Sequence, residues 1–240
     1  MKIFNWSMIR LVLMLALVVF LYSFASHRNE SRKLAKSEVI FLDGDNLFVK
    51  NEMVNKLLIE NKRDVKTIAK VEVDLNKLEK TINNQEMIQQ SEVFVSVDGV
   101  LKAVVKQKTP IARVFDEKGS FYIDYEGNVM PLSDLNTARV LLVSGGINNK
   151  NRKALSDLFR TIYDDDFLKK NIIGVQILPN ESLILKNRNF DYEIDFGRTI
   201  HVKKKFKNYK AFFQKAVLDS SLYKYKKINL MFTQQVVCTK

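Results

Sequence analysis

The segment 107–133 restricts the fold more than any other part of the chain, because two turn signals divide it into three short apolar runs. The runs are Ile111–Phe115, Ser120–Asp124 and Asn128–Leu132, and the turns read Glu-Lys-Gly and Glu-Gly-Asn. Runs of this length bounded by turn residues are typical of β-strands. The segment therefore predicts a β-meander, and it contains no chemically reactive constellation.

The same segment resembles the bacterial cell-division family FtsQ/DivIB. Members of that family carry a Q-x-x-P-x-A-x-x segment that enters a β domain, followed by Y/F-x-[ID]-D-x-x-G. We single out six matching residues as structural positions of this motif: Gln107, Pro110, Arg113, Asp124, Gly127 and Pro131. The flanking matches are Ile111, Ala112, Val114, Phe121, Tyr122, Ile123, Met130, Leu132 and Ser133. The resemblance extends over residues 8–238 and is most specific at 107–133.

An apolar stretch near the N-terminus runs over residues 8–26 and contains one charged residue, Arg10. Its length is close to the roughly 20 residues that cross a bilayer as a helix, and Arg10 can reach the interface. A cleaved signal peptide is the alternative, with Lys2 and Arg10 as its positively charged n-region and Ser23-x-Ala25 as the cleavage site. The family resemblance favours an uncleaved transmembrane anchor, preceded by a short cytoplasmic tail, 1–10, and followed by a stalk, 27–37.

The charges around this stretch do not fix its orientation. Four basic residues follow it between 28 and 36, against two before it, so the positive-inside rule alone does not place the N-terminus inside. The resemblance implies a single-pass protein of the cell inner membrane at the division site. Its N-terminus would be cytoplasmic, and the bulk of the chain would be extracytoplasmic, that is, periplasmic.

Residues 38–106 predict a small domain with the order β-α-β-α-β-β. Strands are expected at 38–42 and 65–73, helices at 49–59 and from Asp74 onward, and a hairpin at 93–105 whose turn is Asp98-Gly99. The order and position resemble the POTRA domain of the FtsQ family.

Residues 107–240 predict the family's β domain, which is a curved, mostly antiparallel sheet with flanking helices. After the meander we expect strands at 139–143, 172–178, 182–185 and 190–196, helices at 154–162 and 206–217, and a last strand at 228–237. The fold class is therefore α+β, with an N-terminal transmembrane helix, a POTRA-like domain and a β domain.

The chain has a net charge of +12 and one cysteine. A single cysteine excludes an intrachain disulfide. The charge is compatible with nucleic-acid binding, with anionic lipid nearby, or with a solvated basic surface. No RNP, zinc-finger or helix-turn-helix pattern accompanies the charge, so we expect a solvated surface and no nucleic-acid partner.

No arrangement of residues in the sequence predicts catalysis, a cofactor or a metal site. The histidines, His27 and His201, are far apart, and Cys238 has no histidine nearby to act as a base. The acidic run 164–166 lacks the spacing of a calcium loop and predicts a turn between helices, with Asp166 as an N-cap. We expect no small-molecule substrate.

The resemblance implies a non-enzymatic scaffold of the division machinery that acts in septum formation and binds FtsB/DivIC-type and FtsL-type subunits. An alternative is a POTRA-containing periplasmic assembly or secretion factor, and an extracytoplasmic hydrolase lacks a reactive constellation. The final strand would be a sheet edge to which a partner adds a strand. Family members carry an apolar-D-L-R-Y/F segment here, whereas this chain has Asn229 and Met231 in place of Asp and Arg. The residues expected at this edge are Leu230, Met231, Phe232, Gln234 and Val236.

Overall fold

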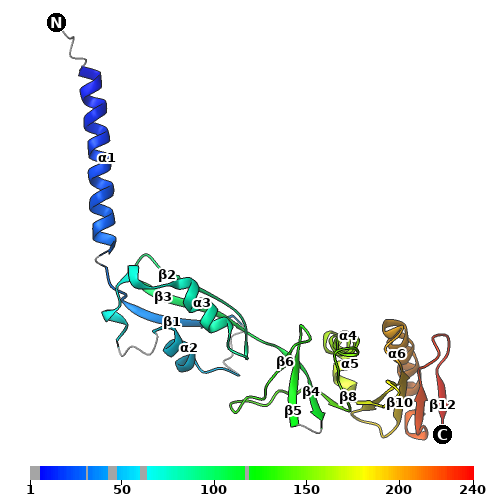
Figure 1. Cartoon of the computed structure of the whole chain (residues 1–240). Coiled ribbons are helices and arrows are strands. Elements are labelled where there is room, and N and C mark those ends of the chain that lie inside the picture. The colour runs from blue at the N-terminus through cyan, green and yellow to red at the C-terminus, as the bar shows by residue number, and fades with distance from the viewer. Residues whose placement is uncertain (1–5, 31, 43–47, 60–63, 117–118) are drawn as a thin grey trace. The chain divides into compact units, whose positions relative to one another are not determined.

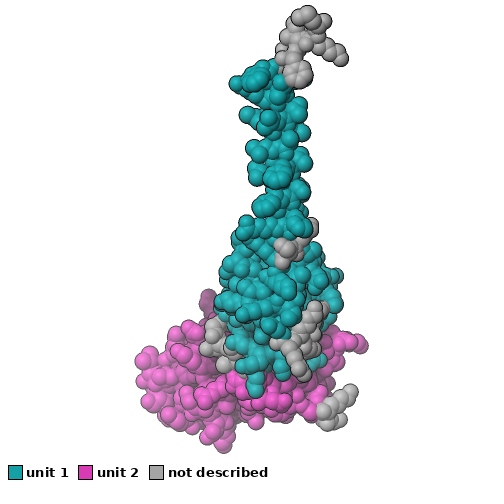
Figure 2. Space-filling view, turned by 90° about the vertical axis from the view of Figure 1, so that its left-hand side faces the viewer, with its two compact units in different colours: residues 1–107 teal, residues 108–240 magenta. Residues whose placement is uncertain are grey.

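The computed structural model describes residues 6–30, 32–42, 48–59, 64–116 and 119–240. The chain divides into two compact units, residues 1–107 (unit 1) and 108–240 (unit 2) (Figure 2). The sequence Asp43-Gly44-Asp45-Asn46 also predicts a turn, but it lies outside the described residues, as do Glu117 and Lys118 of the first meander turn.

The apolar N-terminal stretch forms α1, Trp6–Glu30, with 25 residues (Figure 1). Its segment Met8–Asn29 is long and apolar enough to cross a membrane, and none of its most apolar window is buried within the protein. A helix rises 1.5 Å per residue, so 22 residues span about 33 Å, close to the thickness of a bilayer's hydrocarbon core. The helix continues beyond residue 26, through part of the segment expected to be a stalk.

Beyond α1, the described residues of unit 1 form a three-stranded sheet with two helices. The strands are β1 (Lys36–Phe41), β2 (Ile88–Val95) and β3 (Val100–Gln107), in the order β1-β3-β2, with β1 parallel and β2 antiparallel to β3. The helices are α2 (Asn51–Leu58) and α3 (Leu75–Asn83). Each helix buries two apolar side chains four residues apart, as expected of an amphipathic helix that covers a sheet. These are Val54 and Leu58 on α2, and Leu78 and Ile82 on α3.

The prediction of a strand at 65–73 is wrong. The structure has two short 3₁₀ turns there, η1 (Val65–Thr67) and η2 (Lys70–Glu72), and a single bridge between Lys33 and Ala69. The carboxylate of Asp64 accepts a hydrogen bond from the backbone N–H of Lys66, which starts a helical turn instead of an extended run. The element order is therefore β-α-α-β-β in this unit, within the α+β class that the sequence predicts.

Gln107, the first residue of the family motif, ends β3 and is buried. Its side-chain Oε1 accepts hydrogen bonds from the backbone N–H groups of Phe48 and Val49, each at 3.1 Å. Both donors lie in the segment that leads into α2, and buried N–H groups need an acceptor. Gln107 therefore ties the end of β3 to the entry of α2.

Replacing Gln107 with leucine should destabilise unit 1 by about 2 kcal/mol, because two buried N–H groups lose their acceptor. Hydrogen exchange of the β1 and β3 amides in the full chain measures this loss. Gln90→Leu is the matched control, since Gln90 is exposed on β2 and should change the exchange little. Equal exchange in the two variants would contradict the assigned role of Gln107.

Unit 2 is built on one nine-stranded sheet with the order β12-β11-β10-β9-β8-β7-β4-β5-β6 among the described residues. The sheet is mixed, since β7 is parallel to β4 and β8, and β10 is parallel to β11. The strands are β4 (Pro110–Asp116), β5 (Gly119–Asp124), β6 (Val129–Met130), β7 (Leu141–Ser144), β8 (Ile172–Ile177), β9 (Leu183–Asn187), β10 (Glu193–Gly197), β11 (Lys227–Asn229) and β12 (Val237–Thr239).

Three helices supply the other side of the core of unit 2: α4 (Arg152–Asp164), α5 (Asp166–Asn171) and α6 (Val202–Leu218). Helix α4 buries Leu155, Leu158, Phe159 and Ile162 in one cluster with residues from β4, β5 and the strands β7 to β11. Helix α5 is too short to show a periodic pattern in the sequence. Its N-cap is Asp165, whose carboxylate accepts from the N–H of Leu168, so the expectation of Asp166 as the cap is wrong by one residue.

The meander at 107–133 has the strands that the sequence predicts, β4, β5 and β6. Pro110 begins β4, where a missing N–H is tolerated, and Pro131 follows β6. Arg113 on β4 donates from Nε to the Ser120 hydroxyl on β5, at 2.9 Å. The buried Asp124 accepts from the N–H groups of Glu126 and Asn128, and this bonding closes the turn that contains Gly127.

Candidate partner-binding edge

The final strand expected at 228–237 is two strands separated by a loop. β11 ends at Asn229, and β12 begins at Val237. The Asn229 side chain accepts a hydrogen bond from the N–H of Met231 at 2.8 Å, an interaction that turns the chain out of the strand direction. The five residues expected at the edge therefore lie in the loop 230–236, and the edge itself is β12.

Backbone bonding indicates which groups of β12 face outward. The N–H of Leu230, the residue after β11, donates to the carbonyl of Asp195 on β10, so Ile228 and Leu230 direct their backbone toward β10, while the N–H of Lys226 donates to the carbonyl of Thr239 on β12. The odd-numbered residues of β11 direct theirs toward β12, where Lys227 pairs with Thr239 and Asn229 pairs with Val237. Successive residues alternate in an antiparallel pair. The N–H and C=O of Cys238 consequently face the outer side of the sheet edge.

The side chain of Cys238 points toward the core of unit 2. Cys238 pairs with the buried Ile228 and packs half-buried against the hydrophobic cluster of unit 2. Burial raises the pKa of its thiol, which keeps the sulfur protonated and a poor nucleophile. The position thus combines a core-facing side chain with an outward-facing backbone.

The loop 230–236 does not keep the strand alternation that the sequence predicts. In a continuous strand, Ile228, Leu230 and Phe232 would share one face. Ile228 and Leu230 are buried, but Phe232 is 51% exposed. Met231 is 46% exposed, Gln234 is also exposed, and Val236 packs against the core. The side-chain amide of Asn208 on α6 holds the loop by donating to the carbonyl of Thr233 at 2.9 Å.

A glycine at the end of β10 determines where Met231 lies. A Cβ atom added at Gly197 would come within 2.8 Å of the Met231 Cγ, and Gly197 has a φ of +66°. The absence of a side chain at 197 therefore lets Met231 lie directly against the β10 backbone. Met231 and Phe232 form an exposed apolar pair between β11 and β12.

Positive charge is concentrated at this end of the chain. Residues 198–240 contain 11 Lys or Arg and one Asp, a net charge of +10 out of the +12 of the whole chain. Helix α6 contributes the exposed Lys203, Lys204 and Lys207 and contains no acidic residue. The sequence itself locates this region, since its densest basic run, 203–210, lies on a predicted helix.

Lys205, also on α6, is buried and belongs to the framework of unit 2. Its Nζ donates to the carbonyls of Phe196 at 2.7 Å and Arg198 at 2.9 Å, and lies 4.6 Å from the centre of the Phe196 ring. Burial lowers the pKa of Lys205, while the charge of Asp195 acts in the opposite direction. The side chain thus links α6 to the end of β10.

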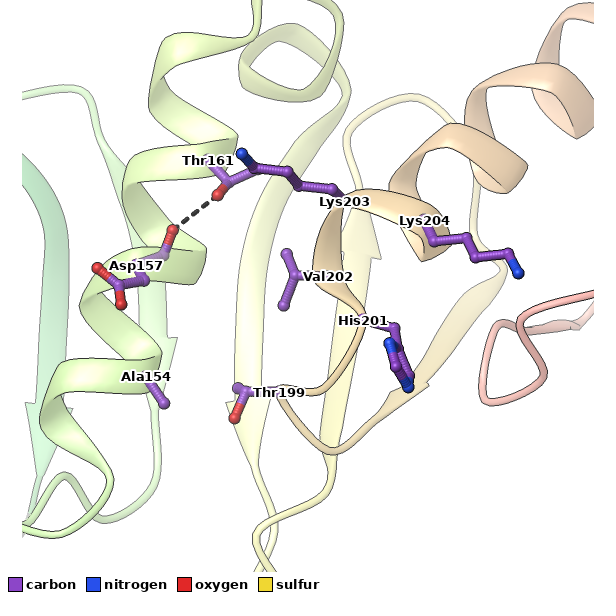
Figure 3. A pocket seen from close by; sticks show the side chains of 8 residues that line it. All are labelled: Ala154, Asp157, Thr161, Thr199, His201, Val202, Lys203 and Lys204. Carbon is purple, nitrogen blue, oxygen red and sulfur yellow. Dashed lines mark hydrogen bonds between the residues drawn. The ribbon is translucent and has the colours of Figure 1, made fainter.

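A groove lies between α4 and the start of α6 (Figure 3). Its lining includes Asp157, His201 and Lys203, and Lys203 extends toward Thr161 in this view. The Thr161 hydroxyl donates to the carbonyl of Asp157 at 2.7 Å. Across the described part of the chain, no three His, Cys, Asp or Glu side chains gather where they could hold a metal ion. The groove offers hydrogen-bonding and charged groups and no nucleophile paired with a base.

The chain has an N-terminal apolar helix, two α+β units and an open sheet edge at the C-terminal end. This is the architecture of the membrane-anchored class of proteins. The described residues assemble no reactive centre. Residues 109–239 match the family model described as FtsQ/DivIB, C-terminal related. The chain belongs to the FtsQ/DivIB family of cell-division proteins, whose members are anchored in the membrane.

Among solved structures, the chain is similar to the major extracytoplasmic domain of the cell-division protein DivIB from Geobacillus stearothermophilus, in its trans isomer. The identity is 17% and the TM-score is 0.35, and the match covers 47% of this chain and 95% of that chain. A comparison with curated proteins found no match.

Proposed function

We propose that this protein is a non-enzymatic, single-pass scaffold of the division machinery in the inner membrane, which holds FtsB/DivIC-type and FtsL-type subunits outside the cytoplasm. The observation that carries the proposal is the outer side of β12, where the backbone of Cys238 faces away from the sheet. Membership of the FtsQ/DivIB family supports the role in division.

The proposed mechanism is addition of a partner strand to β12. A strand lying along this edge gains main-chain hydrogen bonds, and its side chains meet alternate residues of β12, which supply specificity. Val237, 41% exposed, presents its side chain on the face opposite the core. Met231 and Phe232 add apolar contact area next to the edge, so they remain in the proposed interface although they are not part of the strand.

The basic C-terminal region would increase the rate at which a partner with an acidic segment associates. Charged surfaces steer association, and the effect weakens as salt screens the charges. The two departures from the family segment have structural explanations in this chain. Asn229 bonds the Met231 N–H, and Met231 lies against Gly197, so no charged contact at 231 is needed to place the loop.

Unit 1 is assigned in this proposal to recruitment, as a POTRA-like domain, with α1 as the anchor. Its three-stranded sheet and two helices support this assignment, although the second strand expected at 65–73 is not formed. The edge β12 and unit 1 would thus serve different partners.

Cys238→Pro should weaken binding of the FtsB/DivIC-type subunit at least ~10-fold, because proline removes the outward N–H and its ring obstructs an added strand. The measurement is titration of the purified full chain in detergent with that subunit. Proline is tolerated on edge strands, so the variant should keep its fold, as checked by circular dichroism.

Cys238→Ala is the matched control, since it removes the same thiol and keeps the N–H. Binding that survives Cys238→Pro at wild-type strength, with the fold intact, would refute strand addition at β12. If binding falls equally in both variants, the loss of the thiol side chain is the cause. That result would also refute strand addition at β12.

A further inference from the structure

The segment that follows α1 is hydrogen-bonded to two other segments of unit 1. The N–H of Leu34 donates to Ile68 at 3.0 Å, and the N–H of Lys70 donates to Arg32 at 3.0 Å. On the other side, the N–H of Ala35 donates to Gly99 in the β2–β3 turn, at 2.8 Å. The segment expected to be a stalk is therefore paired on both sides from Arg32 onward.

This pairing gathers cations from distant parts of the sequence. Arg32, Lys33 and Lys70 line one open groove of about 640 Å³, together with Asp98, Gly99 and Val97. The carboxylate of Asp98 accepts a hydrogen bond from the Ser96 hydroxyl within its own turn, and this bond is the main cause of its lowered pKa. Three cations against one carboxylate leave the groove with a net positive charge.

Two valines stand exposed beside these cations. Val97 is 87% exposed at the tip of the β2–β3 turn, and Val71 is 63% exposed in η2. Isolated exposed valines are ordinary, but here Val97 lines a basic groove that begins two residues after the end of α1, and Val71 follows Lys70 of that groove in the sequence. We call Arg32, Lys33, Lys70, Val71, Val97 and Asp98 the juxtamembrane surface.

We infer that the juxtamembrane surface binds the headgroups of anionic phospholipids in the membrane that α1 crosses. Basic clusters next to a spanning helix attract anionic lipid, and apolar side chains among them enter the interface. The position of the cluster in the chain favours lipid over a protein partner, because Arg32 follows α1 directly and cannot move far from the bilayer surface. Glu72, which follows Val71 directly in the sequence, is an opposing charge among the described residues.

The inference rests on α1 crossing the membrane, as in the proposed function. Lipid binding would also explain why basic residues follow α1, where the positive-inside rule does not expect them. Residues 28–36 carry four basic residues and one acidic residue on the side expected to be extracytoplasmic. Lipid headgroups would be the partner of Arg32 and Lys33 among these charges once the chain has folded.

The test uses the full chain with Cys238→Ser and Val97→Cys, carrying an apolar fluorophore at position 97, in nanodiscs. The lipid is phosphatidylcholine alone or mixed with phosphatidylglycerol, and a nitroxide on a fraction of the lipid headgroups quenches a fluorophore that contacts them. We expect stronger quenching with phosphatidylglycerol. The triple variant Arg32→Gln/Lys33→Gln/Lys70→Gln should return quenching to its value in neutral lipid. Each lost charge should lower the equilibrium constant for contact with anionic lipid about 5-fold.

Lys80→Gln/Lys106→Gln/Lys108→Gln is the control with the same loss of charge, at positions outside the juxtamembrane surface, and it should retain the quenching. Quenching that is equal in the two lipids, or that falls as far in the control, would overturn the inference. Alkaline carbonate extraction separates the two claims: a chain that leaves the membrane contradicts the anchor, whereas a chain that stays but shows no lipid dependence contradicts only the lipid surface.

Discussion

Gly127→Val is expected to destabilise unit 2 by about 2–4 kcal/mol, through backbone strain and a steric contact together. Gly127 has a φ of +90°, which a β-branched residue rarely adopts. A Cβ atom there would lie 3.0 Å from the Ser156 Oγ and 3.1 Å from its Cβ, and Ser156 is buried on α4. The variant thus strains the β5–β6 turn and pushes it against the helix.

Thermal unfolding of the full chain followed by circular dichroism measures the loss. Gly146→Val is the matched control, because Gly146 has no positive φ and an added Cβ meets no atom within 4 Å. Gly127→Asn separates the two causes, since asparagine tolerates positive φ and still carries a Cβ, so its loss should be intermediate. A Gly127→Val variant as stable as Gly146→Val would refute the assigned geometry of the turn.

Lys205→Met is expected to destabilise unit 2 by about 1–3 kcal/mol, because the carbonyls of Phe196 and Arg198 lose a charged donor. Removing a buried charge also recovers its desolvation cost, which limits the loss. The lost hydrogen bonds outweigh this gain here, since methionine fills similar volume but donates nothing. Lys204→Met, at an exposed neighbouring position on α6, is the control and should stay within ~0.5 kcal/mol of the parent.

The lowered pKa of Lys205 adds a pH signature to the same comparison. The unfolded chain, with an ordinary lysine pKa, binds more protons than the folded chain at pH values between the two pKa values. Stability therefore rises with pH in that window for the parent protein, and Lys205→Met lacks this rise. Denaturant unfolding at several pH values within the window should show the difference between parent and variant growing. A constant difference would mean that the folded pKa of Lys205 is not lowered.

The β4–β6 meander shows where sequence reasoning succeeded, because each of its signals is local. A glycine that needs positive φ, an aspartate that bonds the turn two and four residues on, and a proline at a strand start all act within a few residues. The fold class and the family follow from the same residues. The long apolar run that forms α1 is equally local, since one window of sequence contains the whole feature.

The segments 65–73 and 228–237 show where local patterns failed. Both are rich enough in apolar residues to suggest strands, but hydrogen bonds to other residues decide their structure. In the first, Asp64 starts a 3₁₀ turn, and in the second, Asn229 turns the chain after three paired residues. Alternation over a few residues cannot distinguish a continuous strand from a strand, a loop and a second strand.

The sequence alone determined the order of most elements, the α+β class, the anchor-length helix and the turn chemistry of the central motif. The tertiary structure decided which residues stand at the sheet edge and which charges are accessible. Gln107 meets its two donors 58 and 59 residues away, and Lys205 is buried among exposed lysines of the same helix. Such placements depend on contacts between segments that are far apart in the chain, and a local pattern of residue types carries no information about them.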